Sequence, residues 1–514
     1  MLSYKEFYQL MVSKHKDELE EISSSIDIEW KERQLQLFEE YVKKEYKKYL
    51  EQFSVDINDV SSKNELKNEF VSDFLKVSVN NLVPAKMSFY FIISLLLKGN
   101  IHFPIYKIKL DDNQYYKVIP AIHIFWSQDS SSGKSEGKDF VKNLMEVISN
   151  KIGEKYGISD GFFSLYNIDW TETPQAFINH FEVKQTKKGI QYNFDNVVKG
   201  IFESTDAIFS DESAYLLEEK IYSTQSISEL LLTALEGRPI DKTLVGWNGR
   251  ITTTNPKFLF YGVSRPITKM SEGFLEKGLF QRMLAYFREI TTEQRVSTFS
   301  DLVDMKHQQP NVEKLSDRFV ELYEWKVKNI VQPSNYEFIV WDTNKFKEYF
   351  KTKGKSVMEY ISKEVKSWTM RKVMITFASR YYMKIALSLF ILEAFSRRQF
   401  TITQDVMDNV FNLLDDLLKN MIIFAEYNLI EPKKIINQKR RLKKAIFEYF
   451  KSFNITETDK LSLMKFLQTR LELSPEFIED ALYKFHYDGL IKIESNKIRF
   501  GLLDTYKQIA GGRK

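Results

Sequence analysis

A short apolar run opens the most informative part of the chain. Residues 118–126 are almost all apolar, which predicts a buried strand. Residues 127–135 are small or polar, as in a tight loop. Apolar side chains then recur at helical spacing, at Phe140, Val141, Leu144, Met145, Ile148 and Ile152. The pattern therefore predicts a strand, a polar loop and an amphipathic helix in direct succession.

The loop in this unit ends in Gly133-Lys134-Ser135, the layout of a phosphate-binding P-loop. Backbone N–H groups of such a loop surround the phosphates, and the helix N-terminus adds a favourable dipole. Lys134 is expected to reach the β- and γ-phosphates of ATP, and the Ser135 hydroxyl to hold Mg²⁺. The expected nucleotide-binding residues here are Ser131, Ser132, Gly133, Lys134 and Ser135. Gln128 stands where the pattern has its first glycine, so an ordinary serine-rich turn is the alternative.

A second apolar run, residues 207–209, ends in Ser210-Asp211-Glu212. At a strand end beside a P-loop, Asp211 would join the Mg²⁺ shell, and Glu212 would orient and deprotonate the attacking water. An Asp-Glu pair alone is weak support, because such pairs usually lie on solvated surface. Its position after an expected strand favours the catalytic interpretation.

Three further positions are candidates for sensing or stabilising the γ-phosphate. At the end of a third apolar run, residues 257–263, Ser264 or Arg265 lies where such ATPases keep a residue that senses the γ-phosphate. Arg282 lies among the apolar residues 278–284 and is a candidate arginine finger, with a surface arginine capping a helix as the alternative. Arg380, in an apolar-rich helix expected over 372–393, is a candidate second nucleotide sensor, with a structural ion pair as the alternative.

Residues 243–254 predict a β-hairpin, because β-forming residues flank Asn248-Gly249. That dipeptide suits a type I′ turn, whose two central residues need positive φ. Trp247 and Arg250 would lie at the tip and Lys242 at the base. We expect this hairpin to touch nucleic acid, with arginine on phosphate and tryptophan on a base. An edge hairpin with an exposed tryptophan is the alternative.

The remaining chain is mostly helical in pattern. Residues 1–85 predict charged helices for packing or oligomerisation, with a DNA-contacting collar as the alternative. Residues 87–97 are apolar but too short to span a bilayer, and so predict a buried helix. Residues 312–425 are expected to be wholly helical. Two strands are expected at 104–110 and 115–122, and a helix is expected from Pro174 through Phe181.

The C-terminal part begins with a basic run after Pro432 that includes Lys439, Arg440 and Arg441. Residues 441–503 then predict three helices and a hairpin around Ser495-Asn496. This order is typical of a winged helix, and such modules bind DNA or proteins. We expect Lys439, Arg440 and Arg441 to contact DNA, although a basic run can also be a solvated helix face.

Composition narrows the classes of protein. A chain of 514 residues should hold more than one domain, and 43% hydrophobic residues suffice for sizeable cores. The absence of cysteine excludes a disulfide framework and cysteine-ligated zinc. A net charge of only +4 means that any nucleic-acid contact must be local. The N-terminus is charged rather than signal-like, so we expect a soluble, cytoplasmic protein without membrane contact.

With these motifs, the chain resembles the P-loop helicase part of phage and plasmid primase-helicase proteins over about residues 115–425. It is more distantly similar to superfamily 3 viral helicases and minichromosome maintenance helicases. The resemblance implies an AAA+-like α/β P-loop NTPase core, a helical N-terminal region, a helical lid and a C-terminal winged helix. The expected domains are 1–100, 101–310, 311–430 and 431–514.

The resemblance also implies a function, an ATP-dependent DNA helicase that replicates a virus or mobile element such as a phage or plasmid. Such enzymes form rings, here expected to be hexameric, on single-stranded or forked DNA, and use ATP and Mg²⁺. The arginine finger of the family matches Arg282, whereas Ser264 stands where asparagine is usual. Residues 1–100 show no primase site, so a separate primase or polymerase is a further expected partner. If the chain is viral, the host cytoplasm is its expected location. The alternative is an ATP-switched origin-binding or helicase-loading protein that does not unwind DNA.

Overall fold

The computed structural model describes most of the chain, and everything below concerns the residues it describes. They are residues 8–9, 11–12, 15, 19, 22, 34–43, 64–98, 104–129, 132–158, 161–168, 174–186, 189–213, 227–243, 250–253, 257–266, 270–271, 282–288, 309–331, 335–365, 371, 374–376, 378–379, 383–430, 433–471, 473–487 and 491–500.

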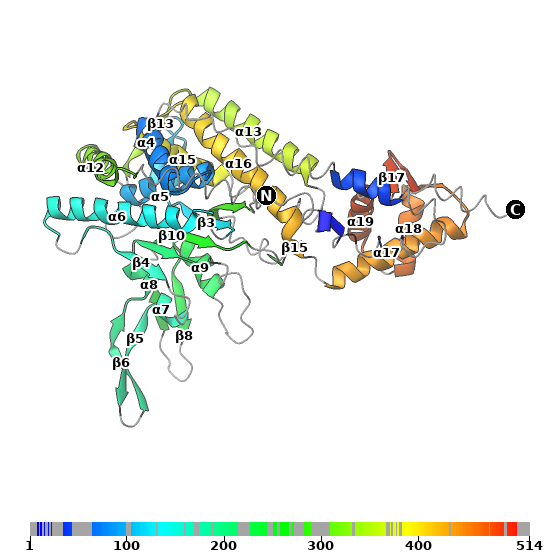
Figure 1. The fold of residues 1–514 in the computed structure, drawn as a ribbon, viewed down its shortest axis with the longest axis horizontal. Helices are drawn as coiled ribbons and strands as arrows, with labels where there is room; N and C mark the ends of the chain where they lie inside the picture. The colour runs from blue at the N-terminus through cyan, green and yellow to red at the C-terminus, as the bar shows by residue number, and fades with distance from the viewer. Residues whose placement is uncertain are drawn as a thin grey trace.

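A parallel five-stranded sheet forms the centre of the fold, in the order β12-β3-β10-β7-β4 (Figure 1). Its strands are β3 (His123–Gln128), β4 (Leu165–Ile168), β7 (Ala207–Ser210), β10 (Leu259–Ser264) and β12 (Met283–Arg288). Every residue of β3, β7 and β10 is buried. Apolar runs with no alternation are what a parallel sheet covered on both faces requires. The expected mixed α/β class with a parallel sheet is therefore confirmed.

Two of the three apolar runs that predicted strands did so correctly, and form β7 and β10, whereas the run over 118–126 is divided between two strands. Val118 ends β2 (Tyr115–Val118), an antiparallel partner of β1 (Tyr106–Lys109), and β3 begins only at His123. The expected single strand over 118–126 is therefore wrong. Pro120 lies between the two strands and has no N–H to donate to a sheet. The expected helix after the loop is α6 (Lys134–Tyr156).

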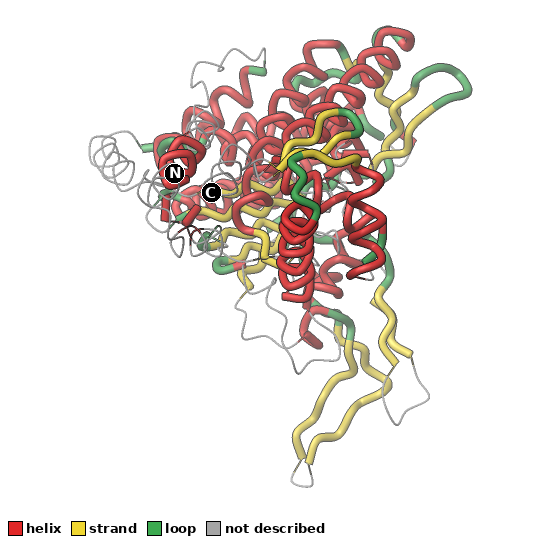
Figure 2. The backbone as a smooth tube through the Cα atoms, turned by 90° about the vertical axis from the view of Figure 1, so that its right-hand side faces the viewer, coloured by secondary structure: helices red, strands yellow, loops and turns green. Residues whose placement is uncertain are grey.

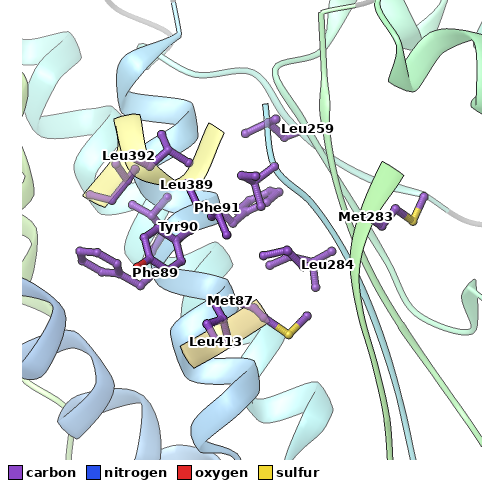
Figure 3. Packing of buried hydrophobic residues seen from close by; sticks show 14 of the residues in the cluster. Met87, Phe89, Tyr90, Phe91, Leu259, Met283, Leu284, Leu389, Leu392 and Leu413 are labelled. Carbon is purple, nitrogen blue, oxygen red and sulfur yellow. The ribbon is translucent and has the colours of Figure 1, made fainter. Parts of the chain in front are cut away.

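Helices from distant parts of the chain pack on the central sheet and on one another. α5 (Leu82–Leu97), α6 and α16 (Gln404–Asn428) contact its strands, and α4 (Glu65–Val77), α12 (Val312–Asn329) and α15 (Met383–Ser396) pack against these helices. In α5 every residue except Lys86 is buried, which confirms the buried helix expected over 87–97. Figure 3 shows side chains of α5, α15, β10 and β12 meeting in this core. This one hydrophobic cluster contains buried residues from both sides of positions 100 and 310, two of the domain boundaries expected from the sequence.

Residues 312–425 are not wholly helical, contrary to expectation. Two strands, β13 (Glu337–Val340) and β14 (Thr401–Ile402), join β1 and β2 in a sheet of order β14-β13-β1-β2. Phe338 and Val340 of β13 are buried, whereas Ile339 between them is exposed. This alternation is a strand signal, but its partner β1 lies far away in the sequence. The helix α13 (Thr343–Glu364) follows β13 directly.

A helix through Phe181 is also wrong. The helix α7 (Pro174–Phe177) ends after four residues, and Phe181 belongs to β5 (His180–Thr186). β5 pairs with β6 (Gly189–Val198) in a long antiparallel hairpin that the sequence analysis did not find. The helix therefore starts at Pro174 as expected, but the strand pairing that begins at His180 keeps it short.

The hairpin expected over 243–254 is present, formed by β8 (Ile240–Thr243) and β9 (Arg250–Thr253). Its register departs from expectation. A two-residue turn at Asn248-Gly249 would set Arg250 opposite Trp247, but Arg250 lies opposite Thr243. Figures 1 and 2 show that the β5–β6 and β8–β9 hairpins project side by side from the same end of the molecule. Asn179 joins their bases, because its backbone N–H donates to Thr253 Oγ1 at 2.8 Å.

The C-terminal part has a hydrophobic cluster of its own, from Leu442 to Ile498. It contains α17 (Lys433–Ser452), β16 (Glu457–Asp459), α18 (Lys460–Leu471), α19 (Pro475–Tyr487), β17 (Ile491–Glu494) and β18 (Lys497–Phe500). The three strands form an antiparallel sheet of order β16-β18-β17. The expected three helices and hairpin are therefore present, with β16 in addition.

Four further elements are short. They are the helices α8 (Ile201–Ser204) and α9 (Ile227–Leu235) and the paired strands β11 (Met270–Ser271) and β15 (Leu429–Ile430). None of the helices in the described part of the chain has the length and apolar character needed to cross a membrane.

Candidate phosphate-binding site

The carboxyl ends of three neighbouring strands define the candidate site. β10 lies between β3 and β7, and all three run parallel. Their ends therefore bring together the loop before Lys134, the pair Asp211-Glu212 and the pair Ser264-Arg265. In open parallel sheets, ligands bind in the crevice outside the carboxyl ends of the strands. The residues singled out from three distant stretches thus meet at the edge where a ligand is expected.

Lys134 is the first residue of α6 and is 9% exposed. Gly133 before it has φ +79°, a left-handed conformation that glycine adopts without strain. Lys134 Nζ lies 3.4 Å from the carbonyl oxygen of Asp129. Burial lowers the pKa of Lys134, and the nearby carboxylate of Glu212 opposes that shift. Arg265 lowers the same pKa further, so Lys134, Glu212 and Arg265 share one electrostatic environment.

Both candidate acids are paired with cations. Oε1 of Glu212 accepts a hydrogen bond of 2.8 Å from Nε of Arg265, and Glu212 has φ +55°. Oδ2 of Asp211 lies 2.5 Å from Nζ of Lys138, one helical turn after Lys134. The Lys138 side chain is only 7% exposed, whereas that of Asp211 is 58% exposed. The Asp211 carboxylate is therefore accessible to a cation from solvent, whereas the ammonium group that pairs with it is buried.

Three polar residues line the same edge. Ser264 is the last residue of β10, is fully buried and lies opposite Ser127 of β3. Ser135 is exposed in the first turn of α6. Gln128, in the place of the usual glycine, is buried, and its Oε1 accepts a hydrogen bond of 2.6 Å from Trp126 Nε1. The glutamine is thus held against its own strand.

Arg282 lies at the amino ends of the parallel strands, whereas Lys134 lies near their carboxyl ends. It directly precedes β12, where Met283 lies opposite His123, the first residue of β3. Since β3 rises about 3.3 Å per residue, Arg282 is separated from the loop edge by roughly 17 Å along the strands. Its guanidinium pairs with Oε1 of Glu236 at 2.5 Å. Arg282 therefore does not lie at the candidate site of its own chain.

Several other candidate residues are described only in part. Ser132 is buried and donates from Oγ to the carbonyl oxygen of Asp129 at 2.5 Å. Ser131, Trp247 and Arg380 lie outside the described residues. Lys242 and Arg250 lie in the paired strands of the β8–β9 hairpin, where only their backbone is described. In α17, Lys439 is half-buried and Arg441 is exposed, and only the backbone of Arg440 is described.

Residues that the sequence analysis missed contact the loop from the N-terminal side. The turn between α4 and α5 contains Ser78 and Asn81, both fully buried. Ser78 Oγ donates to the carbonyl oxygen of Gly133 at 2.6 Å, and Asn81 Nδ2 donates to that of Ser132 at 2.8 Å. A Ser-Val-Asn-Asn sequence between two helices indicates a turn. Nothing local in it identifies a partner that lies some fifty residues later in the chain.

Two oxygen-bearing side chains of the candidate site could join a Mg²⁺ shell, the Ser135 hydroxyl and the Asp211 carboxylate. Mg²⁺ commonly takes one or two protein ligands and completes its shell with water and phosphate oxygens. Among the described residues, no group of three or more His, Cys, Asp or Glu side chains could hold a metal ion.

Comparison with models of known protein families finds no family that matches this chain, and comparison with curated proteins finds no match. The interpretation of the site therefore depends on its residues and their geometry.

Proposed function

We propose that the chain is an ATP-driven, ring-forming DNA helicase with an AAA+-like P-loop core. The observation that carries the proposal is the convergence of Lys134, Asp211-Glu212 and Ser264-Arg265 at one edge of the parallel sheet. A buried lysine at a helix N-terminus, two acids and an arginine are the groups that phosphoryl transfer to water requires.

In this proposal the chain supplies charge and positioning. Gly133, Lys134 and the N-terminus of α6 bind the phosphates of ATP, and Ser135 and Asp211 bind Mg²⁺. Mg²⁺, when bound, neutralises charge on the transferred phosphoryl group. Glu212 accepts the proton of the attacking water, and Ser264 contacts the γ-phosphate. Arg380 has the role of a second nucleotide sensor.

The position of Arg282 supports a ring. Because it lies at the sheet edge away from its own phosphate site, it is suited to act in the site of a neighbouring subunit. An arginine supplied in trans is a known way to stabilise charge on the γ-phosphate during transfer. The ring, expected to be a hexamer, thus builds each active site from two chains.

DNA contact is assigned to the β8–β9 hairpin and to the C-terminal unit, which we propose to be a winged helix. Lys242, Trp247 and Arg250 belong to that hairpin. The β5–β6 hairpin lies beside it and extends the same projection (Figure 2). In α17, Arg441 is exposed to solvent and Lys439 is half-buried. The proposed substrate is single-stranded or forked DNA of a virus or mobile element, copied by a separate primase or polymerase.

The test is ATP hydrolysis and strand separation by the purified full-length chain. Single-stranded DNA should stimulate hydrolysis, and forked DNA should be unwound when ATP and Mg²⁺ are present. Lys134→Ala should abolish both activities, whereas Lys142→Ala, two turns further along α6, should keep them. ATP-dependent DNA binding with the fork left intact would favour the alternative, a helicase-loading or origin-binding protein. Failure of ATP to bind would refute both proposals.

A further inference from the structure

We infer that the turn between α4 and α5, residues Ser78–Asn81, is a brace that holds the phosphate loop in its binding conformation. Ser78 and Asn81 are then positioning residues for nucleotide, although they do not touch it. This inference rests on the proposed nucleotide-binding function of the loop. It adds a requirement that the loop sequence itself does not contain, because the brace comes from a different part of the chain.

The brace consists of hydrogen bonds from side chains of the turn to carbonyl groups of the loop. Ser78 Oγ donates to the Gly133 carbonyl at 2.6 Å. Asn81 Nδ2 donates to the Ser132 carbonyl at 2.8 Å and to Ser78 Oγ at 2.9 Å. All of these groups are buried, so water does not compete for them.

These bonds fix the direction of the loop's peptide groups. A peptide unit is planar and its C=O and N–H point in opposite directions. Holding the carbonyls of Ser132 and Gly133 toward the turn therefore directs the N–H groups that follow away from it. A phosphate-binding loop needs its N–H groups free to face the anion. A loop that is already ordered loses less conformational entropy when it binds, which favours affinity.

The brace and the loop are also closely packed against each other. A Cβ atom added to Gly133 would lie 3.1 Å from Ser78 Cα, tighter than most van der Waals contacts. One added to Gly137, on the next turn of α6, would lie 2.7 Å from Phe74 Cζ and 3.0 Å from Ser78 Oγ. Glycine inside a helix costs stability relative to alanine. Gly137 is explained by this close approach of α4 to α6.

The turn is anchored at its other end to the central sheet. Asn80 has φ +62°, and its carbonyl oxygen accepts a hydrogen bond of 2.6 Å from Nη1 of Arg288, the last residue of β12. The helices on either side, α4 and α5, belong to the main hydrophobic cluster. The brace thus connects the loop to helices of the main hydrophobic cluster and to β12 of the central sheet.

Asn81 offers a substitution of nearly unchanged shape. Among the described residues its Oδ1 has no hydrogen-bond partner, so the Nδ2 donors account for its contacts with the loop. Asn81→Asp removes these donors and sets a negative charge beside the loop. Ser78→Ala removes its hydrogen bond to the Gly133 carbonyl, which also accepts a helical hydrogen bond of 2.9 Å from the Gly137 N–H. Ser88→Ala is the matched control, because Ser88 is a buried serine of α5 that bonds Tyr261 and the Pro84 carbonyl and not the loop.

The experiment measures two quantities on each full-length variant, with melting temperature recorded alongside. The first is the exchange of backbone amide hydrogens in residues 132–140 without nucleotide. The second is the dissociation constant of a non-hydrolysable ATP analogue with Mg²⁺. Ser78→Ala should speed exchange in this segment and weaken binding about threefold to tenfold, the effect of one hydrogen bond. Asn81→Asp should weaken binding by more than tenfold. Ser88→Ala should change neither the exchange in residues 132–140 nor the dissociation constant of the analogue.

The outcomes separate this inference from the proposed function. If wild-type protein binds no ATP analogue, the proposed function fails, and the exchange data alone decide whether the turn holds the loop. If wild-type protein binds and the two variants, still folded, bind equally well, the brace is overturned and the proposed function stands. Equal exchange in residues 132–140 for Ser78→Ala, Asn81→Asp and wild type also overturns it. Faster local exchange together with weaker binding, absent in Ser88→Ala, supports it.

Discussion

Nε of Arg265 donates a hydrogen bond of 2.8 Å to Oε1 of Glu212, and so ties the loop after β10 to the loop after β7. The pair lies at the sheet edge where Lys134 is buried. Both side chains are partly exposed, at 70% for Arg265 and 38% for Glu212, so water screens their attraction. An exposed ion pair contributes at most about 1 kcal/mol. The pair therefore orients Glu212 without being a large source of stability.

The first prediction separates the carboxylate of Glu212 from its ion pair. Glu212→Gln should keep the affinity for ATP within about threefold and lower turnover by at least about 100-fold, because only water activation is removed. Arg265→Gln breaks the same pair but keeps the carboxylate, and should lower turnover by no more than about tenfold. Steady-state hydrolysis and analogue binding give both numbers. Wild-type turnover in Glu212→Gln would refute its assignment as the base.

The second prediction concerns Lys138, whose ammonium group lies 2.5 Å from the Asp211 carboxylate. Mg²⁺ and this ammonium group compete for one acid. Lys138→Met should therefore lower the Mg²⁺ concentration that gives half-maximal hydrolysis, by about threefold to fivefold for an ion pair worth under 1 kcal/mol. Lys142→Met, one turn further along α6 and paired with Glu146, is the control and should leave the Mg²⁺ requirement unchanged. A higher Mg²⁺ requirement in Lys138→Met would mean that Asp211 is not a metal ligand.

Much of the site's position was predictable because its signals are local. The apolar runs of β7 and β10 and the helical spacing after Lys134 each describe an element without reference to the rest of the chain. A buried parallel strand must be apolar on both faces, so such runs stand out. Their polar ends then meet at one sheet edge for geometric reasons.

The errors arise where partners distant in sequence decide the structure. β13 forms because Phe338 and its neighbours pair with β1, which lies more than two hundred residues earlier. The β5–β6 hairpin limits the helix that starts at Pro174 to four residues. The contacts of Ser78 and Asn81 with the loop, and of Arg282 with Glu236, follow from tertiary packing that no local pattern encodes.

The third prediction is a pH dependence of stability that originates in the strand before the loop. Burial lowers the pKa of His123 to about 4, and its Nδ1 accepts a hydrogen bond of 3.2 Å from the Phe260 N–H. An unfolded histidine titrates near about 6.5. Between these values the unfolded chain binds more protons than the folded one, so stability falls as pH drops from about 6.5 to 4. The limiting slope for one such group is about 1.4 kcal/mol per pH unit.

The measurement compares melting temperatures of wild type and His123→Asn across this range. Asparagine keeps an acceptor for the Phe260 N–H but does not titrate there, so the difference between the two proteins isolates His123. The variant should lose less stability on acidification, even if it is less stable at neutral pH. Parallel curves for the two proteins would show that His123 is not the group responsible.

The fourth prediction concerns the C-terminal unit, which has its own hydrophobic cluster. Removing residues 432–514 should therefore spare the main core and basal hydrolysis, but weaken DNA binding in a salt-dependent way. Each DNA phosphate that the shortened chain no longer neutralises should reduce the slope of log affinity against log salt by about 0.7–0.9. Titrations of labelled DNA at several salt concentrations give the slope. An unchanged slope would mean that the C-terminal unit neutralises no DNA phosphates, and that it binds protein or has no binding partner.

The last prediction is that Arg282 works in the active site of a neighbouring subunit. Arg282 lies at the amino ends of the parallel strands and Lys134 near their carboxyl ends, so the two residues do not meet within one chain. Losing an arginine finger typically costs about 10³–10⁵ in rate. Arg282→Ala and Lys134→Ala should therefore each be nearly inactive. Arg238→Ala is the control, since Arg238 pairs with the same Glu236 carboxylate at 2.8 Å but is exposed, and it should stay active.

Mixing the two inactive variants tests whether Arg282 acts in the active site of a neighbouring subunit. Arg282→Ala protein keeps an intact phosphate loop, and Lys134→Ala protein keeps an intact Arg282. In mixed rings some interfaces join the intact phosphate loop of one chain to the intact Arg282 of the next chain, so part of the activity should return. Specific activity of wild-type protein should likewise rise with concentration, because a monomer lacks a complete site. If mixed rings form and remain as inactive as their components, Arg282 acts through its pairing with Glu236 and has a structural role.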